Sequence, residues 1–150
     1  MYKRHKVLLL ICIIGTFLMA FFFNWEFEAV AEVAITVASI AMGVYIAAVS
    51  ALLGSQYAQE LKSKTDPEYP TKTLLGVLAS YFRLAGASCV LLIIISCAFL
   101  IPTNLDLTNN LVNLFFRCGE CLSYAVFAAN IIFLWLILIF LVNSLGKSIK

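Results

Sequence analysis

The chain has 150 residues, of which 63% are hydrophobic and 12% are charged, and its mean hydropathy is +1.02. A soluble domain carries about 25% charged residues, and half that fraction cannot cover a globule of this size, so we expect lipid to be the solvent for much of the surface. The net charge of +2, with no Lys/Arg stripe outside short flanks, argues against nucleic-acid binding, and the odd count of five cysteines argues against a secreted disulfide scaffold.

The first apolar run covers residues 7–23 and follows a short basic segment, Lys3-Arg4-His5-Lys6. This layout is that of a secretory signal peptide. However, the run ends in MAFFFNW, which offers no small-residue cleavage site. We therefore predict that it is a retained signal anchor, the first of several membrane spans.

Three further runs are long enough to cross a bilayer, which takes about 20 predominantly apolar residues. These spans cover residues 29–54, 74–101 and 122–145, with an inner loop at 55–73 and an outer loop at 102–121. Arg83 interrupts the third span, but the 18 uncharged residues that follow it give about 27 Å of helix. Arg83 can therefore extend from the first turns to the lipid headgroups.

The basic residues orient these spans. If the N-terminus lies inside, nine of the ten basic residues lie inside and only Arg117 lies outside. The nine are Lys3, Arg4, Lys6, Lys62, Lys64, Lys72, Arg83, Lys147 and Lys150. By the positive-inside rule we predict an all-α integral membrane bundle of four transmembrane helices, a single multi-pass domain of the cell membrane with its N-terminus and C-terminus in the cytoplasm.

The two longer connections differ in character. In the inner loop, residues 56–62 suit a helical extension of the second span, and the pairs Asp66-Pro67 and Tyr69-Pro70 break that helix, which predicts a short helical hairpin. In the outer loop, residues 105–116 mix Asn and Asp with Leu, Val and Phe, as a helix lying in the membrane interface does.

Small residues follow one face of the second span. Ser39, Gly43, Ala47 and Ala51 recur at every fourth position, which lets another backbone approach closely. Two interpretations stay open. The face packs within the chain's own bundle, or it forms a contact between copies or lines a pore.

Three strongly polar or ionisable residues fall within the spans: Glu32, Arg83 and Asn130. Such residues are functional candidates by default. Glu32 and Arg83 lie near the ends of their spans and also suit a role as interface anchors, whereas Asn130 lies deeper and is expected to hydrogen-bond to another helix. No acidic residue lies at the centre of a span, which argues against a proton-coupled transporter with a midplane carboxylate.

Cys118 and Cys121 form a C-x-x-C pair directly before the fourth span. Such a pair can cycle between dithiol and disulfide, and its position resembles that of the active-site pair in vitamin K epoxide reductases and, less closely, in DsbB-type oxidases. Those families relay electrons through a second pair of outer-loop cysteines, which this sequence lacks. We expect no cofactor and no metal site, because zinc would need two further ligands and the only histidine, His5, lies on the other side of the membrane.

The middle of the chain resembles a family of small membrane proteins. Residues 39–55, SIAMGVYIAAVSALLGS, precede a charged inner loop and the stretch YFRLAGASCVLL at 81–92. This third of the chain is similar to the corresponding part of RexB-like proteins, four-span phage-exclusion proteins thought to form a membrane-depolarising channel. The inner loop departs from that family, since here it is mixed in charge and carries two prolines, whereas the RexB loop is densely basic.

The leading hypothesis is a small bacterial or phage-type membrane effector, an ion-channel-like protein of phage defence that self-associates and permeabilises or depolarises the membrane. One alternative is a membrane thiol–disulfide oxidoreductase that uses Cys118 and Cys121. Another is a non-catalytic accessory subunit of a different membrane protein. The expected partners are the lipid bilayer and either further copies of the chain or that other membrane protein.

Overall fold

The structure is a computed structural model that describes residues 2–66, 68–71, 73–101 and 110–148. It has five helices: α1 (Lys3–Phe23), α2 (Glu28–Leu53), α3 (Gln56–Ser63), α4 (Leu74–Leu100) and α5 (Asn110–Ser148). These residues form no strand beyond one isolated antiparallel bridge. Four of the helices are long and apolar enough to cross a membrane, which confirms the prediction of an all-α bundle and indicates a multi-pass membrane protein.

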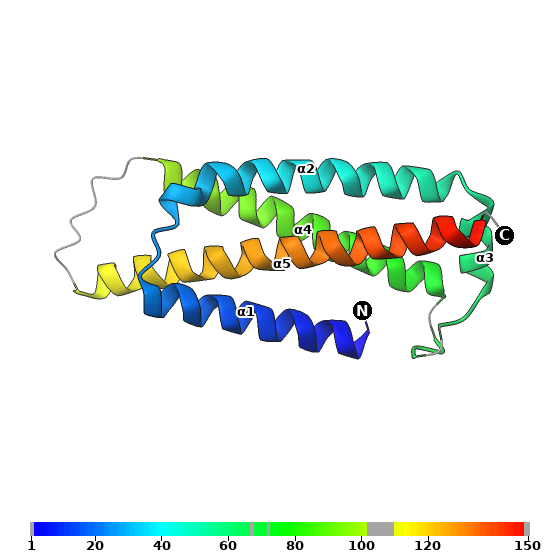
Figure 1. Cartoon of the computed structure of the whole chain (residues 1–150), viewed down its shortest axis with the longest axis horizontal. Coiled ribbons are helices and arrows are strands. Elements are labelled where there is room, and N and C mark those ends of the chain that lie inside the picture. The colour runs from blue at the N-terminus through cyan, green and yellow to red at the C-terminus, as the bar shows by residue number, and fades with distance from the viewer. Residues whose placement is uncertain (1, 67, 72, 102–109, 149–150) are drawn as a thin grey trace.

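The four long helices alternate in direction along the chain (Figure 1). α1 begins and α5 ends at the end of the bundle where α3 lies, which we call the α3 end. α2 packs along α4, α5 packs against α4, and α1 lies mainly against α5. The centre is thus formed by α2, α4 and α5, and α1 is an outer helix attached through α5.

The surface of α1 is apolar on every side. Ala20 is its only buried residue, and Leu10 and Ile11 are 58% and 61% exposed. A helix of this kind suits lipid on most of its circumference. Its end is set by Asn24, whose φ of 53° is a left-handed conformation that asparagine tolerates after a helix and whose N–H bonds to the carbonyl of Ala20.

The contact between α2 and α4 is built on small side chains. α2 buries a row of alanines together with Tyr45 and Leu52. α4 buries Ala85, Cys89 and Leu92 against them, and Phe133 and Ile137 of α5 complete the same core. Small side chains bring the helix axes close together and raise the van der Waals contact, the main attraction between helices in lipid.

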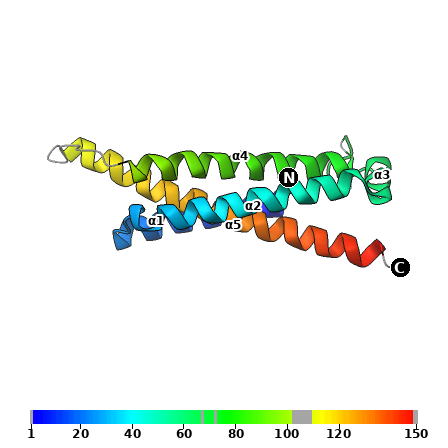
Figure 2. The same ribbon diagram turned by 90° about the horizontal axis from the view of Figure 1, so that it is seen from above.

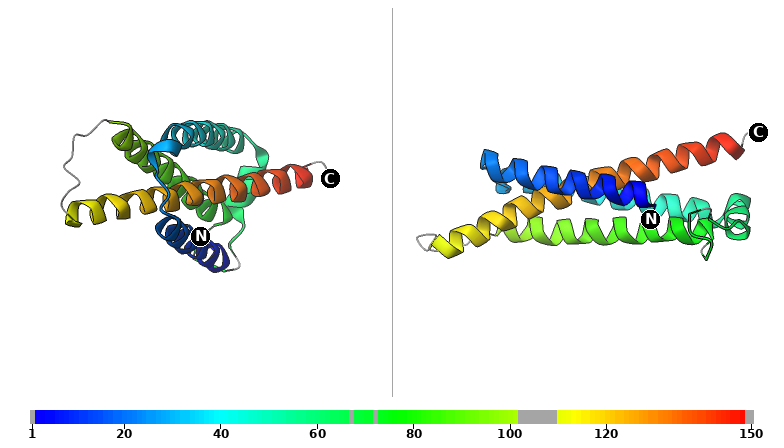
Figure 3. Two further views of the ribbon diagram at one scale, coloured as in Figure 1. Left: turned by 60° about the vertical axis from the view of Figure 1, so that its left-hand side comes forward. Right: turned by 90° about the horizontal axis from the view of Figure 1, so that it is seen from below.

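α5 is the longest helix. Its 39 residues make it about 58 Å long, well beyond the roughly 30 Å hydrocarbon core of a bilayer. Its membrane-length apolar part is Asn113–Phe140. Figures 2 and 3 show that it crosses the bundle obliquely, so its C-terminal part diverges from α4 near the α3 end.

The predicted span limits lie close to the helix ends, with two differences. α1 begins at Lys3 instead of residue 7, and α5 begins at Asn110, so that residues 110–121, expected in the outer loop, are helical. Of the expected interfacial stretch, residues 105–109 lie outside the described part of the chain. Residues 110–121 contain no proline, so their backbone permits the earlier start of α5.

The inner connection forms a separate short helix. Ser55 caps α3, and its Oγ accepts the N–H of Ala58 at 3.3 Å. The chain therefore turns at the end of α2, and α3 lies across the end of the bundle where α2 ends and α4 begins (Figure 1). Leu61 of α3 packs with Leu52 and Leu78 in a small apolar cluster that fixes α3 to α2 and α4.

Candidate functional site

The small residues predicted from α2 lie on its outward side. Ser39, Gly43, Ala47 and Ala51 are all exposed, whereas the buried face of the same helix carries a different alanine row. The Ser39 hydroxyl donates to the carbonyl of Ile35 at 2.8 Å, so this polar group is satisfied within its own helix. We call these four residues the outward α2 face.

A shallow apolar groove runs beside the outward α2 face, between α2 and α4. Ser39 and Gly43 line it on one side, and Val90 and Ile94 line it on the other. A β-carbon added at Gly43 would meet no atom within 4 Å, so the bundle does not need a glycine there. The monomer therefore leaves open the space that the small residues create.

Asn130 connects α5 to α4. Its Nδ2 donates to the carbonyls of Ser88 and Val126 at 3.2 and 2.9 Å, and its Oδ1 accepts from Ser88 Oγ at 3.1 Å and Cys89 Sγ at 2.9 Å. Both ends of the amide are thus used. At 1% exposure the side chain has no contact with solvent or lipid, and the arrangement is that of an interhelical polar junction.

Glu32 and Arg83 lie apart from this junction. Both side chains are exposed, Glu32 one turn into α2 and Arg83 in the third turn of α4. They lie towards opposite ends of the bundle, so the structure does not bring the three intramembrane polar residues together.

The C-x-x-C pair lies inside α5 and not at its start. Cys118 is exposed and Cys121 is buried, and both are free. Eight residues of helix precede Cys118, so the pair lies beyond the first turn of α5. The effect of a helix N-terminus on a thiol is largest within that first turn. The other three cysteines lie within α1 and α4.

A group of polar side chains that sequence reasoning did not predict meets at the α3 end. Tyr2, His5, Asp66 and Tyr81 come from three separate parts of the chain, and we call them the N-terminal polar cluster. The Tyr2 hydroxyl donates to Asp66 Oδ2 at 2.6 Å, and the Tyr2 N–H donates to the Tyr81 hydroxyl at 2.9 Å. His5 Nδ1 lies 2.7 Å from the same Tyr81 oxygen. The start of α1 is thereby attached to α4 and to the loop before it.

Asp66 is the charged member of this cluster and is 1% exposed. Besides Tyr2, the backbone N–H groups of Glu68 and Tyr69 donate to its Oδ1 at 2.8 and 2.9 Å. Burial alone would raise the pKa of Asp66, but these hydrogen bonds hold that pKa below its ordinary value. Burial, the hydrogen bond to Asp66 and its charge in turn raise the pKa of Tyr2, so the pair is a carboxylate and a neutral phenol near neutral pH.

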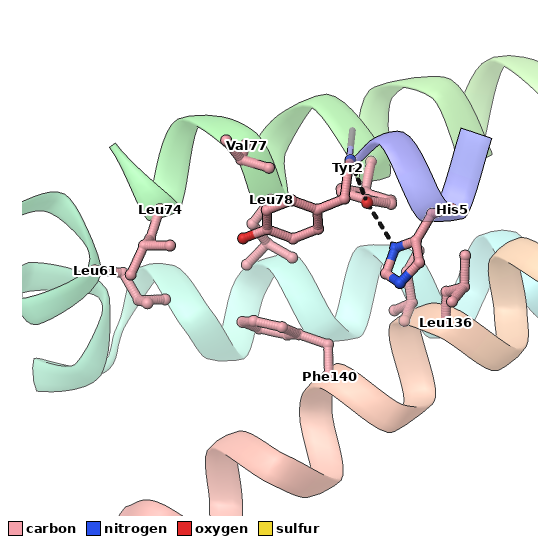
Figure 4. A pocket seen from close by; sticks show the side chains of 10 residues that line it. Tyr2, His5, Leu61, Leu74, Val77, Leu78, Leu136 and Phe140 are labelled. Carbon is pink, nitrogen blue, oxygen red and sulfur yellow. Dashed lines mark hydrogen bonds between the residues drawn. The ribbon is translucent and has the colours of Figure 1, made fainter. Parts of the chain in front are cut away.

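A cavity of about 250 Å³ lies beside the cluster, where α5 diverges from α4 (Figure 4). Tyr2, His5 and Tyr81 supply its polar wall. The apolar wall consists of Leu61, Leu74, Val77, Leu78, Leu136, Ile137 and Phe140. Four helices, α1, α3, α4 and α5, therefore contribute to one partly open cavity.

The sequence held only a weak signal for this cluster. Its hydrogen bonds join residues that are 64 to 79 positions apart, and tyrosine or histidine beside a membrane span is commonly an interface residue. The Asp66-Pro67 pair predicted a break in the helix, but it did not predict the hydrogen-bond partners of the Asp66 carboxylate. Comparison of the chain with protein-family models, with characterised proteins and with solved structures finds no match in any of the three.

Proposed function

We propose that this protein is a small membrane effector that self-associates through the outward α2 face and permeabilises or depolarises the membrane. The observation that carries the proposal is the position of Ser39, Gly43, Ala47 and Ala51 on the side of α2 that the bundle does not use. In lipid, a row of small residues gains its packing energy only against another helix. A second copy of the chain would supply that helix.

The packing of the monomer supports a conducting path between copies as part of this proposal. The centre of α2, α4 and α5 is filled by residues such as Ala34, Ala38, Cys89 and Leu92, all of them fully buried. Protein interiors of this kind are close-packed and do not admit ions. Permeabilisation would therefore depend on association, with the α3 end in the cytoplasm as the basic residues predict.

Two glycines provide a matched test. Gly43 of the outward α2 face and Gly15 of α1 are both exposed, and a β-carbon at either would meet nothing within 4 Å. The monomer thus has room for a side chain to begin at both positions. We would label the wild type, Gly43→Leu and Gly15→Leu with fluorescent donors and acceptors, reconstitute them in vesicles, and measure energy transfer on dilution with lipid together with potassium flux.

The proposal predicts that Gly43→Leu weakens self-association about tenfold or more and lowers flux, while Gly15→Leu resembles the wild type. A wild type that remains monomeric and gives no ion flux at any voltage would contradict it. Equal association and flux in all three proteins would contradict the assigned surface. A monomer that co-purifies with a different membrane protein would instead favour the accessory-subunit alternative.

A further inference from the structure

The cavity at the α3 end combines a largely apolar lining with the imidazole of His5. The Tyr81 oxygen already accepts the N–H of Tyr2. If its own hydrogen points to His5 Nδ1, 2.7 Å away, every polar atom of that contact is satisfied. In that tautomer Nδ1 is the acceptor and Nε2 carries the N–H.

His5 Nε2 forms no hydrogen bond among the described residues, and the His5 side chain is partly buried. Figure 4 shows the His5 ring beside the cavity, with the dashed hydrogen bond on one of its two nitrogens. The cavity wall around it is aliphatic or aromatic, with Leu78, Leu136 and Phe140 among its members. A donor in such surroundings selects a molecule that brings an acceptor.

We infer that this cavity is a binding site for a compact, uncharged, largely apolar molecule whose carbonyl oxygen accepts a hydrogen bond from His5 Nε2–H. The cavity volume of about 250 Å³ limits the size of the ligand. An engineered cavity of roughly 150 Å³ holds benzene, so the cavity at the α3 end suits a molecule of two fused rings. The apolar wall favours an uncharged ligand, because the free-energy cost of burying a carboxylate without a matched cation is far greater than that of burying a carbonyl.

The route into the cavity follows from the helix arrangement. α5 diverges from α4 at this end, and Leu136 and Phe140 are only partly buried. An apolar molecule dissolved in the bilayer can therefore reach the site from the side. The Tyr2–Asp66 hydrogen bond holds the start of α1 over it, so the site exists only while α1 is docked.

The test uses 1-tetralone and tetralin, which share a fused two-ring skeleton and differ in the carbonyl. His5 is the only histidine of the chain, so ring-¹⁵N histidine gives the two nitrogen signals of a single imidazole in nanodiscs. We expect a saturable shift of the Nε2 signal with 1-tetralone. We also expect tetralin, followed by saturation-transfer NMR, to bind between about twofold and tenfold more weakly, the contribution of one hydrogen bond.

Two sets of variants locate the site. His5→Phe should weaken 1-tetralone to the level of tetralin and leave tetralin itself unchanged, which would show that the cavity is intact. Leu136→Trp fills the cavity and should abolish saturable binding of both compounds. Leu138→Trp is its control, since Leu138 is 40% exposed on the same helix and lies outside the cavity lining.

Three results would overturn the inference. Shifts that rise without saturation, and equally in Leu136→Trp, would mean partition into lipid only. Tighter binding of 1-naphthoate than of 1-tetralone would contradict an uncharged ligand. A His5 signal that differs between nanodiscs of ester-linked and ether-linked lipids, and that 1-tetralone does not move, would assign the site to the ester carbonyl of a membrane lipid.

Discussion

The hydroxyl of Tyr2 lies 2.6 Å from Oδ2 of Asp66 and joins the residue before α1 to the loop before α4. This contact matters because α1 is otherwise held mainly by its packing on α5. The backbone N–H of Lys3 adds a second connection to the same loop, at 3.0 Å from Glu68 Oε1. The start of the first helix is thus held by a few hydrogen bonds at the α3 end, whereas the rest of the helix packs on α5.

Removing either partner of this contact should release the start of α1. We expect Tyr2→Phe and Asp66→Ala each to lower the midpoint of thermal unfolding. The midpoint of the double variant should lie only slightly below that of the less stable single variant, because both substitutions remove one shared interaction. A double-mutant cycle in detergent, followed by circular dichroism, measures the coupling. Strictly additive effects would mean that the hydrogen bond contributes nothing to stability.

The same pair makes stability depend on acid. Because the pKa of Asp66 is lower in the folded protein than in the unfolded chain, its contribution is fully present above the ordinary pKa and is lost as the pH falls through the lowered value. We expect the unfolding midpoint of the wild type to fall below about pH 4 more steeply than that of Asp66→Asn. Identical profiles for the two proteins between pH 5 and pH 2 would contradict this assignment.

Asn130 should be a structural residue. Replacing it by leucine removes three hydrogen bonds between α4 and α5 and one within α5. We expect a loss of about 1 kcal/mol in the free energy of unfolding, the typical value of an interhelical polar contact in a membrane. Reversible unfolding in bicelles measures it. Flux that is abolished while stability is unchanged would instead indicate that Asn130 acts in conduction.

The cysteine pair gives a clean test of the redox alternative. Cys118 and Cys121 are free, and their place inside α5 gives neither thiol the activation of a helix start. We expect the variant with serine at both positions to keep the full ion flux in vesicles and the full membrane depolarisation in cells. A lost phenotype that returns with an external thiol oxidant would support the oxidoreductase alternative.

The four long helices could be predicted because the physics leaves one solution. A run of about 20 apolar residues in lipid must satisfy its backbone internally, and a helix does so. Pro102 follows the end of α4, and Ser55 and Thr73 stand at cap positions, so several limits were also encoded locally. The early start of α5 could not be predicted, because residues 110–121 combine polar and apolar side chains that suit a loop, an interfacial helix or a continuous helix.

The pairing of helices and the N-terminal polar cluster could not be predicted. α1 is apolar all round, so nothing in its sequence selects α5 over α4 as its neighbour. Tyr2, His5 and Tyr81 each suit the membrane interface, and only the crossing of α5 and the turn at Asp66 bring them together. The small face of α2 was found from its spacing, but the spacing alone did not tell which side of the helix the bundle would bury.

If copies must associate to permeabilise the membrane, the most direct test counts copies while measuring flux. Labelled protein is reconstituted into single immobilised vesicles, where stepwise photobleaching gives the number of copies and a voltage-sensitive dye gives the potassium flux. We expect no flux from vesicles that hold one copy and a steep onset once several are present. Flux that is proportional to copy number from the first copy onward, or no flux at any number, would contradict it.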